Sequence, residues 1–216
     1  MKIYIFSGLG ADKRVFVNLQ LPPQFEPVHI DWEIPAKEET LESYALRLAK
    51  NIDTQNPFML LGVSMGGMIA TEIAKKYQPR LTILISSVPI AKELPPLFKW
   101  TGWVGIHKII PAALYKNVSI AKRIFTTEQP QNKILIRQVI QDTDPRFVTW
   151  AVNAILNWHN ETLPKPYVHI HGRQDEVLPI KYTHPTHIIM EGKHLLVLEN
   201  TGALNSLLQE ILTPYR

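Results

Sequence analysis

Six short apolar runs, separated by stretches of helical character, restrict how this chain can fold more than any other feature. The runs are residues 2–7, 27–31, 58–62, 81–86, 167–171 and 186–190. Most of them are continuously apolar, which is the pattern of strands buried on both faces. Strands that alternate with helices favour parallel pairing. The sequence therefore predicts a three-layer α/β fold, in which a six-stranded parallel sheet lies between two layers of helices.

Helix signals fill several of the intervals between these runs. Helices are expected from a cap at Thr40 to about residue 51, from about residue 66 to 77, and from 203 to 212. The clearest helix begins at Pro145, with Thr143 or Asp144 as its cap. Its apolar residues recur at three- and four-residue spacing: Phe147, Trp150, Ala151, Ala154, Ile155 and Trp158. We expect this stripe to pack in the core against the sheet.

Residues 88–141 interrupt the alternation of strands and helices. The segment is rich in proline, aromatic and basic residues and has only weak helical periodicity. We therefore expect a single domain over residues 1–216, with residues 88–141 inserted as a helical cap or lid. Its lysines and arginines form either a solvated surface or a lid that attracts anionic substrates or an acidic partner.

Charge, cysteine content and the length of the apolar runs exclude several classes of protein. The net charge of +4 is too small to indicate a nucleic-acid partner, and the absence of cysteine excludes disulfides and thiolate metal sites. No segment approaches the roughly 18 consecutive apolar residues of a membrane span. The apolar run at residues 2–7 is too short for a signal peptide. We expect a cytoplasmic protein that does not insert into membranes and is a monomer or homodimer.

Ser64 lies in the most informative motif of the chain. Residues 62–67, "GVSMGG", follow an apolar strand and precede a helical stretch, which is the setting of a G-x-S-x-G nucleophile elbow. Glycines on both sides permit the strained turn that projects a serine from the carboxyl edge of a sheet. The alternative is a small residue where a helix packs closely on a strand. Ser64 is therefore a candidate nucleophile.

A nucleophilic serine needs a base within hydrogen-bond reach and a carboxylate that orients the base. On a parallel sheet, both groups should follow later strands at the same edge. Asp175, in the loop "HGRQDEVLP", is the candidate acid, with Glu176 as its rival. His194, in the loop "IIMEGKHLL", is the candidate base. His171 is the alternative base, although it could instead hold the acid loop by hydrogen bonds.

Acyl transfer also needs donors for the developing oxyanion. The backbone N–H of Met65, at the start of a helix, is one candidate. The N–H of Leu9, in the turn formed by residues 7–10, is the other. This turn could also be a simple connection between a strand and a helix capped by Asp12.

Four segments together resemble the α/β-hydrolase superfamily: "FSGLGAD", "GVSMGG", "HGRQDEVLP" and "GKH". The resemblance implies Ser64 as nucleophile, His194 as base and Asp175 as orienting acid. It also implies an oxyanion hole from the N–H groups of Leu9 and Met65. The implied reaction requires no metal or cofactor. The first two antiparallel strands of the superfamily have no counterpart here, so the expected strand order is 4-3-5-6-7-8 in the superfamily's numbering.

These residues predict a serine hydrolase of carboxylic esters or thioesters that works through an acyl-enzyme. The substrate is a small molecule, and the basic cap would suit one with an anionic group. Five apolar cap residues are expected to bind the acyl group, unless they pack in the core: Leu97, Phe98, Trp100, Trp103 and Phe125.

Two other functions remain open at this point. One is a cofactor-free lyase of the same superfamily, similar to the menaquinone-pathway synthase or the hydroxynitrile lyases. The other is a ligand-binding protein without turnover, similar to the hormone receptors built on this fold. A complete set of serine, histidine and aspartate disfavours the receptor, because binding alone does not need the acid.

Overall fold

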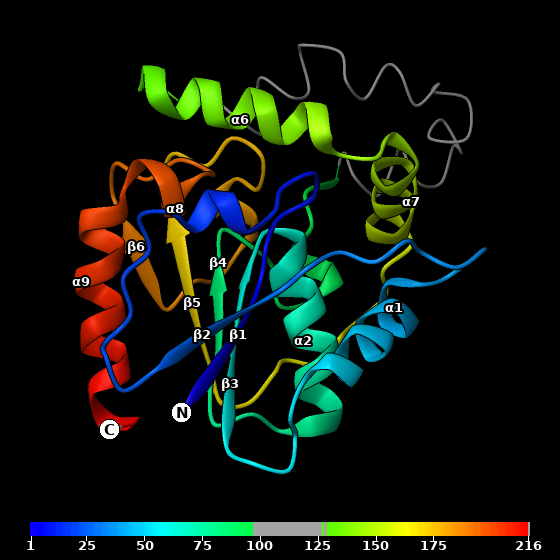
Figure 1. Ribbon diagram of the computed structural model, residues 1–216, viewed down its shortest axis with the longest axis horizontal. Helices are drawn as coiled ribbons and strands as arrows, with labels where there is room; N and C mark the ends of the chain where they lie inside the picture. Colours follow the sequence, from blue (N-terminus) through cyan, green and yellow to red (C-terminus); the bar gives the residue numbers. More distant parts are fainter. Residues whose placement is uncertain (97–126, 128, 216) are drawn as a thin grey trace.

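The computed structural model describes residues 1–96, 127 and 129–215 (Figure 1). Within this part of the chain the strands form one six-stranded parallel sheet in the order β2-β1-β3-β4-β5-β6. The strands are β1 (Lys2–Phe6), β2 (Glu26–Ile30), β3 (Phe58–Val63), β4 (Thr82–Ile85), β5 (Tyr167–Gly172) and β6 (His187–Ile189). The predicted order 4-3-5-6-7-8 is thereby confirmed.

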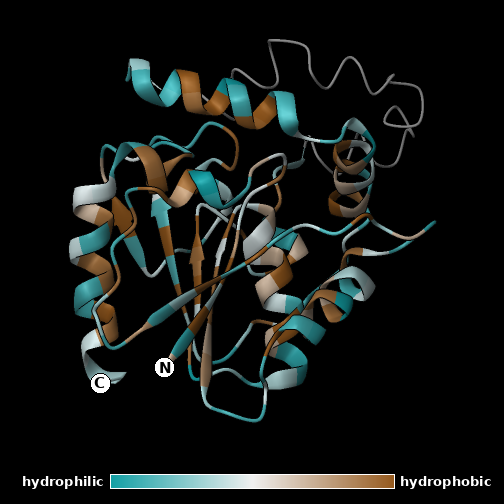
Figure 2. Ribbon diagram, in the orientation of Figure 1, coloured by the Kyte–Doolittle hydropathy of each residue, from teal (hydrophilic) through white to brown (hydrophobic). Residues whose placement is uncertain are grey.

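Two helical layers cover the sheet. One contains α1 (Leu41–Leu48), α2 (Met65–Tyr77) and α7 (Pro145–Leu156). The other contains α8 (Leu196–Glu199) and α9 (Thr201–Leu212), and α6 (Pro130–Asp142) packs on the same core from above the carboxyl edge of the sheet (Figure 1). Alternate residues of β1 enter the two cores, because Tyr4 belongs to the first layer's cluster and Ile3 and Ile5 to the second's. In Figure 2 the central strands are mainly brown, whereas the helices carry both colours. The predicted three-layer arrangement is confirmed.

The helix starts follow the predicted capping chemistry. Before α1, the hydroxyl of Thr40 accepts the N–H of Ser43 at 3.1 Å, and the hydroxyl of Ser43 accepts the N–H of Thr40 at 3.0 Å. Before α7, the carboxylate of Asp144 accepts the N–H of Arg146 at 2.8 Å. Asp144, and not Thr143, is therefore the cap of α7.

In the described part of the chain, α8 and the 3-10 helices Ile180–Tyr182 and Thr213–Tyr215 have no counterpart among the predicted elements. The 3-10 helix Ala91–Glu93 and nearly all of α6 fall within the predicted cap, and Ala49–Asn51 ends the helix predicted to about residue 51. The 3-10 helix Lys13–Phe16 is capped by Asp12, which was the alternative for the turn after the first strand. The five cap residues predicted to bind the acyl group lie outside the described residues: Leu97, Phe98, Trp100, Trp103 and Phe125. The extent of the cap over residues 88–141 stays a prediction. Within the described residues, no helix is long and apolar enough to cross a membrane.

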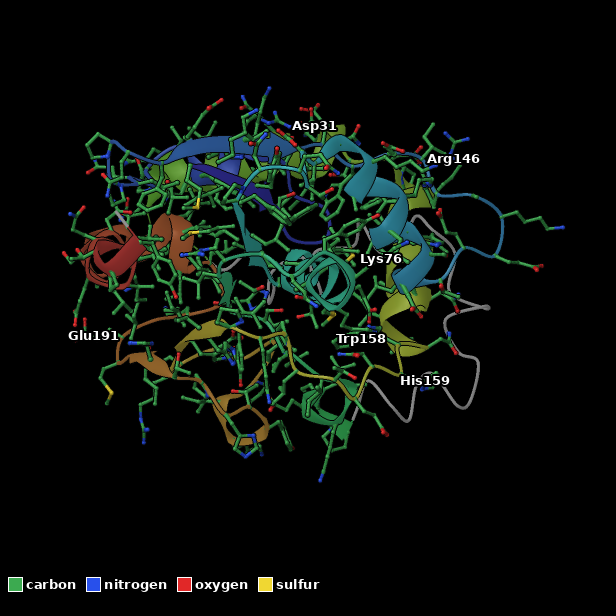
Figure 3. The ribbon with its side chains drawn as sticks, turned by 90° about the horizontal axis from the view of Figure 1, so that it is seen from below. Asp31, Lys76, Arg146, Trp158, His159 and Glu191 are labelled. Carbon is green, nitrogen blue, oxygen red and sulfur yellow. The ribbon has the colours of Figure 1, made fainter. Side chains whose placement is uncertain are left out.

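The apolar stripe of α7 is part of the core, as predicted, but its tryptophans contact helices. Trp150 packs on Tyr44 of α1 with ring centroids 4.3 Å apart. Trp158 lies beyond the end of α7 and is labelled in Figure 3. Its indole N–H donates to Glu72 of α2 at 2.7 Å. Glu72 is only 2% exposed and also pairs with Lys75 at 2.6 Å. The stripe therefore joins α7 to the layer of α1 and α2.

Replacing Trp158 with phenylalanine should lower the free energy of unfolding by about 1–3 kcal/mol, because the buried carboxylate of Glu72 loses a donor. Urea denaturation measures this change. Trp32→Phe is the control, since the Trp32 indole donates at 2.9 Å to the neutral carbonyl of Ala11 at a partly exposed site. Trp32→Phe should therefore lower the free energy of unfolding by less than Trp158→Phe does. An equal or larger loss in Trp32→Phe would contradict the importance assigned to Glu72.

Candidate active site

Ser64 forms the turn between β3 and α2 in a backbone conformation that side chains rarely adopt, with φ 53° and ψ −121°. The neighbouring glycines leave no room for a side chain. A Cβ on Gly62 would lie 2.2 Å from the carbonyl oxygen of Gly66, and one on Gly66 would lie 2.3 Å from that of Ser7. The hydroxyl of Ser87 donates to the carbonyl of Ser64 at 2.7 Å. These contacts hold Ser64 at the carboxyl edge of the sheet, partly exposed.

The structure brings together the three residues predicted from separate loops. The hydroxyl oxygen of Ser64 lies 3.1 Å from Nε2 of His194. Nδ1 of His194 lies 2.8 Å from Oδ2 of Asp175. His194 and Asp175 are 4% and 3% exposed, so water competes little for their hydrogen bond. The arrangement has the connectivity of a nucleophile, a base and an orienting acid.

The surroundings of Asp175 keep its carboxylate charged and fixed. Burial alone would raise its pKa, but the close contact and hydrogen bond with His194, together with the N–H of Leu178, lower the pKa below its ordinary value. Oδ1 accepts the N–H groups of Val177 and Leu178, each at 2.8 Å. Oδ2 is therefore left to face His194.

Glu176, the rival for the acid, is exposed to solvent. Among its described partners, His194 is hydrogen-bonded to Asp175 and Ser64. The geometry therefore favours Asp175 over Glu176, and the assignment of the acid stays a prediction.

The acid loop and the base loop are joined directly through their backbones. The N–H of Gln174 donates to the carbonyl of Gly192 at 2.8 Å, and the N–H of Arg173 donates to that of Ile189 at 3.0 Å. A Cβ on Gly172 would lie 2.3 Å from the carbonyl oxygen of Gly192. This close contact sets the distance between the two loops, and hence the distance between Asp175 and His194.

His171, the alternative base, does not contact Ser64 among the described hydrogen bonds. Its Nε2 lies 2.8 Å from the carbonyl oxygen of Leu178, and its Nδ1 lies 3.1 Å from Nε2 of His169. His171 therefore holds the acid loop, which was the other role considered for it. His169 falls within the strand predicted over residues 167–171, and the sequence predicted no role for it. The spacing of two residues in β5, directly before the acid loop, was the available signal.

A cavity of about 20 Å³ adjoins Ser64 and is lined mainly by apolar groups. This volume holds about one water molecule. Its lining residues are Gly8, Leu9, Ala11, Val15, Val63, Ser64, His194, Leu195 and Val197. Both predicted oxyanion donors are close by, because Leu9 lines the cavity and Met65 is the first residue of α2. The buried hydroxyl of Ser7 donates to the carbonyl of Ala11 at 2.7 Å and closes the turn that carries Leu9.

No group of three or more histidine or acidic side chains suited to a metal ion occurs in the part of the chain that the structure describes. The side chains that meet at the site are a serine hydroxyl, an imidazole and a buried carboxylate. Such a set transfers an acyl group or moves a proton.

Residues 41–185 match the model of the family described as serine aminopeptidase, S33. The matched span contains Ser64 and Asp175 and ends before His194. Because it covers well over half of the chain, the protein belongs to this family and is an α/β-hydrolase.

Individual relatives are distant but cover most of the chain. A pimeloyl-[acyl-carrier protein] methyl ester esterase of Legionella pneumophila (strain Paris) is 25% identical, over 90% of this chain and 82% of its own length. An esterase from Exiguobacterium antarcticum has a TM-score of 0.77 at 17% identity, over 100% of this chain and 91% of that one. MenH from S. aureus has a TM-score of 0.74 at 16% identity, over 99% of this chain and 94% of that one. These two structures establish a shared fold.

Gly172→Ala should lower the free energy of unfolding by about 1–3 kcal/mol, because its Cβ would meet the backbone of Gly192. Gly202→Ala is the matched control, since a Cβ there meets nothing within 4 Å. In that helical position alanine should leave stability unchanged or raise it by up to about 1 kcal/mol. Urea denaturation of both variants measures the difference. Equal stability of the two would show that the loops do not need this close contact.

Proposed function

We propose that this protein is a serine hydrolase that cleaves a carboxylic ester or thioester through an acyl-enzyme on Ser64. One observation carries the proposal: the continuous hydrogen-bonded series from Ser64 through His194 to Asp175, which begins at a strained turn. A serine that served only as a spacer would not need a buried carboxylate behind its histidine partner.

The proton positions follow from the partners. Because Asp175 accepts, Nδ1 of His194 carries the proton and Nε2 has a free lone pair for the hydroxyl of Ser64. In acylation, Ser64 Oγ bonds to the substrate carbonyl carbon while Nε2 takes the hydroxyl proton. That proton then passes to the departing alcohol or thiol as its bond to carbon breaks.

Deacylation repeats these steps with water. Nε2 of His194 takes a proton from water, whose oxygen attacks the acyl carbon, and the proton returns to Ser64 as the acid leaves. The N–H groups of Leu9 and Met65 are the proposed donors to the oxyanion in both tetrahedral intermediates. Their position beside Ser64 supports this role.

The proposed substrate is a carboxylic ester or thioester. The Legionella relative is named for a methyl ester of an acyl-carrier-protein conjugate, which supports an ester. The cap predicted at residues 88–141 would contact the rest of the substrate. Its described helix α6 lies above the carboxyl edge of the sheet (Figure 1), where Asn132 donates to Glu199 at 2.7 Å beside the end of α8.

A fluorophosphonate probe should label the wild-type protein and should not label Ser64→Ala, because the probe reacts with an activated serine. A series of p-nitrophenyl esters of increasing chain length then measures turnover. Wild-type protein that fails to label would overturn the nucleophile. Labelling without any ester turnover would favour the lyase, and ligand binding without turnover that survives Ser64→Ala would favour the receptor.

Asp175→Asn should lower kcat by roughly 10⁴-fold, as the equivalent change does in serine proteases, because an amide does not fix the required tautomer of His194. Glu176→Gln is the matched control in the same loop and should leave kcat within about twofold. Steady-state kinetics on the best p-nitrophenyl ester distinguishes the two. If Glu176→Gln were the damaging change, the acid would be misassigned.

A further inference from the structure

Two buried histidines lie directly beneath the acid loop and take no part in the proposed reaction. His169 and His171 are two residues apart in β5 and thus lie on the same face of the sheet. Both are 0% exposed, and their rings meet edge to face with centroids 5.1 Å apart. Buried polar rings without a purpose are rare because removing them from water is unfavourable. Their partners therefore indicate what they do.

The proton of His171 has one possible position. Its Nε2 lies 2.8 Å from the carbonyl oxygen of Leu178, and a carbonyl only accepts, so Nε2 carries the proton. Nδ1 of His171 then holds a lone pair, and Nε2 of His169, 3.1 Å away, donates to it. Each of the two rings therefore donates one N–H hydrogen bond toward the acid loop.

Both rings are neutral in this arrangement. Burial lowers the pKa of His171. Burial and the neighbouring His171 lower the pKa of His169 to about 3. A neutral His171 matters for the site, because its Nε2 lies 3.4 Å from Oδ2 of Asp175. A cation there would compete with His194 for the same carboxylate oxygen.

The target of this series is the backbone that holds the acid. The N–H of Leu178 donates to Oδ1 of Asp175, while its carbonyl accepts from His171. Leu178 is thereby held from both sides, and Asp175 is tied to β5 through it. We propose that His171 is a positioning residue for Asp175, and that the neighbouring ring of His169 holds the ring of His171 in place. The proposal rests on the proposed hydrolase function, since it concerns the orientation of that site.

Kinetics of three variants tests the positioning role. His171→Leu removes the donor to Leu178 and should lower kcat about tenfold to a hundredfold with KM within about twofold. His171→Gln keeps an N–H group at similar reach and should restore most of the lost kcat. His29→Leu, which removes a partly buried histidine of the distant strand β2, should leave kcat unchanged. Wild-type kcat in His171→Leu, or equal impairment of the leucine and glutamine variants, would overturn the proposal.

Ring-nitrogen NMR tests the tautomer without any turnover. In ¹⁵N-labelled wild-type protein between pH 6 and 8, His169 and His171 should both be neutral with the proton on Nε2. The same signals should appear in Ser64→Ala. A protonated Nδ1 or a charged ring at His171 would overturn the proposal, even if a leucine variant were unstable. Absence of fluorophosphonate labelling in the wild type would instead remove the hydrolase function, so the two failures are distinguishable.

Discussion

The close approach of α2 to the end of β1 is the constraint on which the site depends. Gly66, in the first turn of α2, lies so near the carbonyls of Phe6 and Ser7 that no side chain fits between them. At this approach β3 turns into α2 through the single residue Ser64, which has a positive φ. The same approach puts Gly8 beside Ser64, because a Cβ on Gly8 would lie 3.4 Å from the Cβ of Ser64. One backbone contact thus positions both Ser64, the proposed nucleophile, and the turn proposed to bind the oxyanion.

A second backbone contact positions the proposed acid and the proposed base. Gly172 and Gly192 touch at the ends of β5 and β6, and the loops that follow carry Asp175 and His194. Since backbone atoms are fixed by the parallel sheet, the hydrogen bond between the two side chains needs little further adjustment. Behind it, His171 ties the acid loop to β5. The reacting groups are therefore supported by the sheet edge itself, which is how a preorganised site avoids rearrangement during reaction.

Much of this arrangement could be predicted from the sequence because it depends on local rules. Continuous apolar runs gave the strands, and the G-x-S-x-G segment marked the turn at Ser64. The positions of Asp175 and His194 followed from the rule that loops at the carboxyl edge of a parallel sheet converge. The strand order came from the resemblance to the α/β-hydrolases, and the sheet confirms it.

Other features depend on contacts that sequence periodicity does not report. The stripe of α7 indicated burial, but the pairing of Trp158 with Glu72 on α2 arises from tertiary packing. The helix α8 is a short turn held by its neighbours, with too few residues for a periodic signal. The spacing of His169 and His171 placed both rings on one face of β5, but it did not predict that they contact each other. That contact depends on how the acid loop folds back on β5.

Rapid quenching during turnover of a p-nitrophenyl ester, followed by mass spectrometry of the digested protein, tests the acyl-enzyme most directly. A hydrolase that works through Ser64 should show a burst of p-nitrophenol near one equivalent when deacylation is slow, with one acyl group on the peptide that contains Ser64. The modification should be absent from Ser64→Ala. An acyl group on another residue, or a burst that persists in Ser64→Ala, would contradict the assignment of Ser64 as the nucleophile.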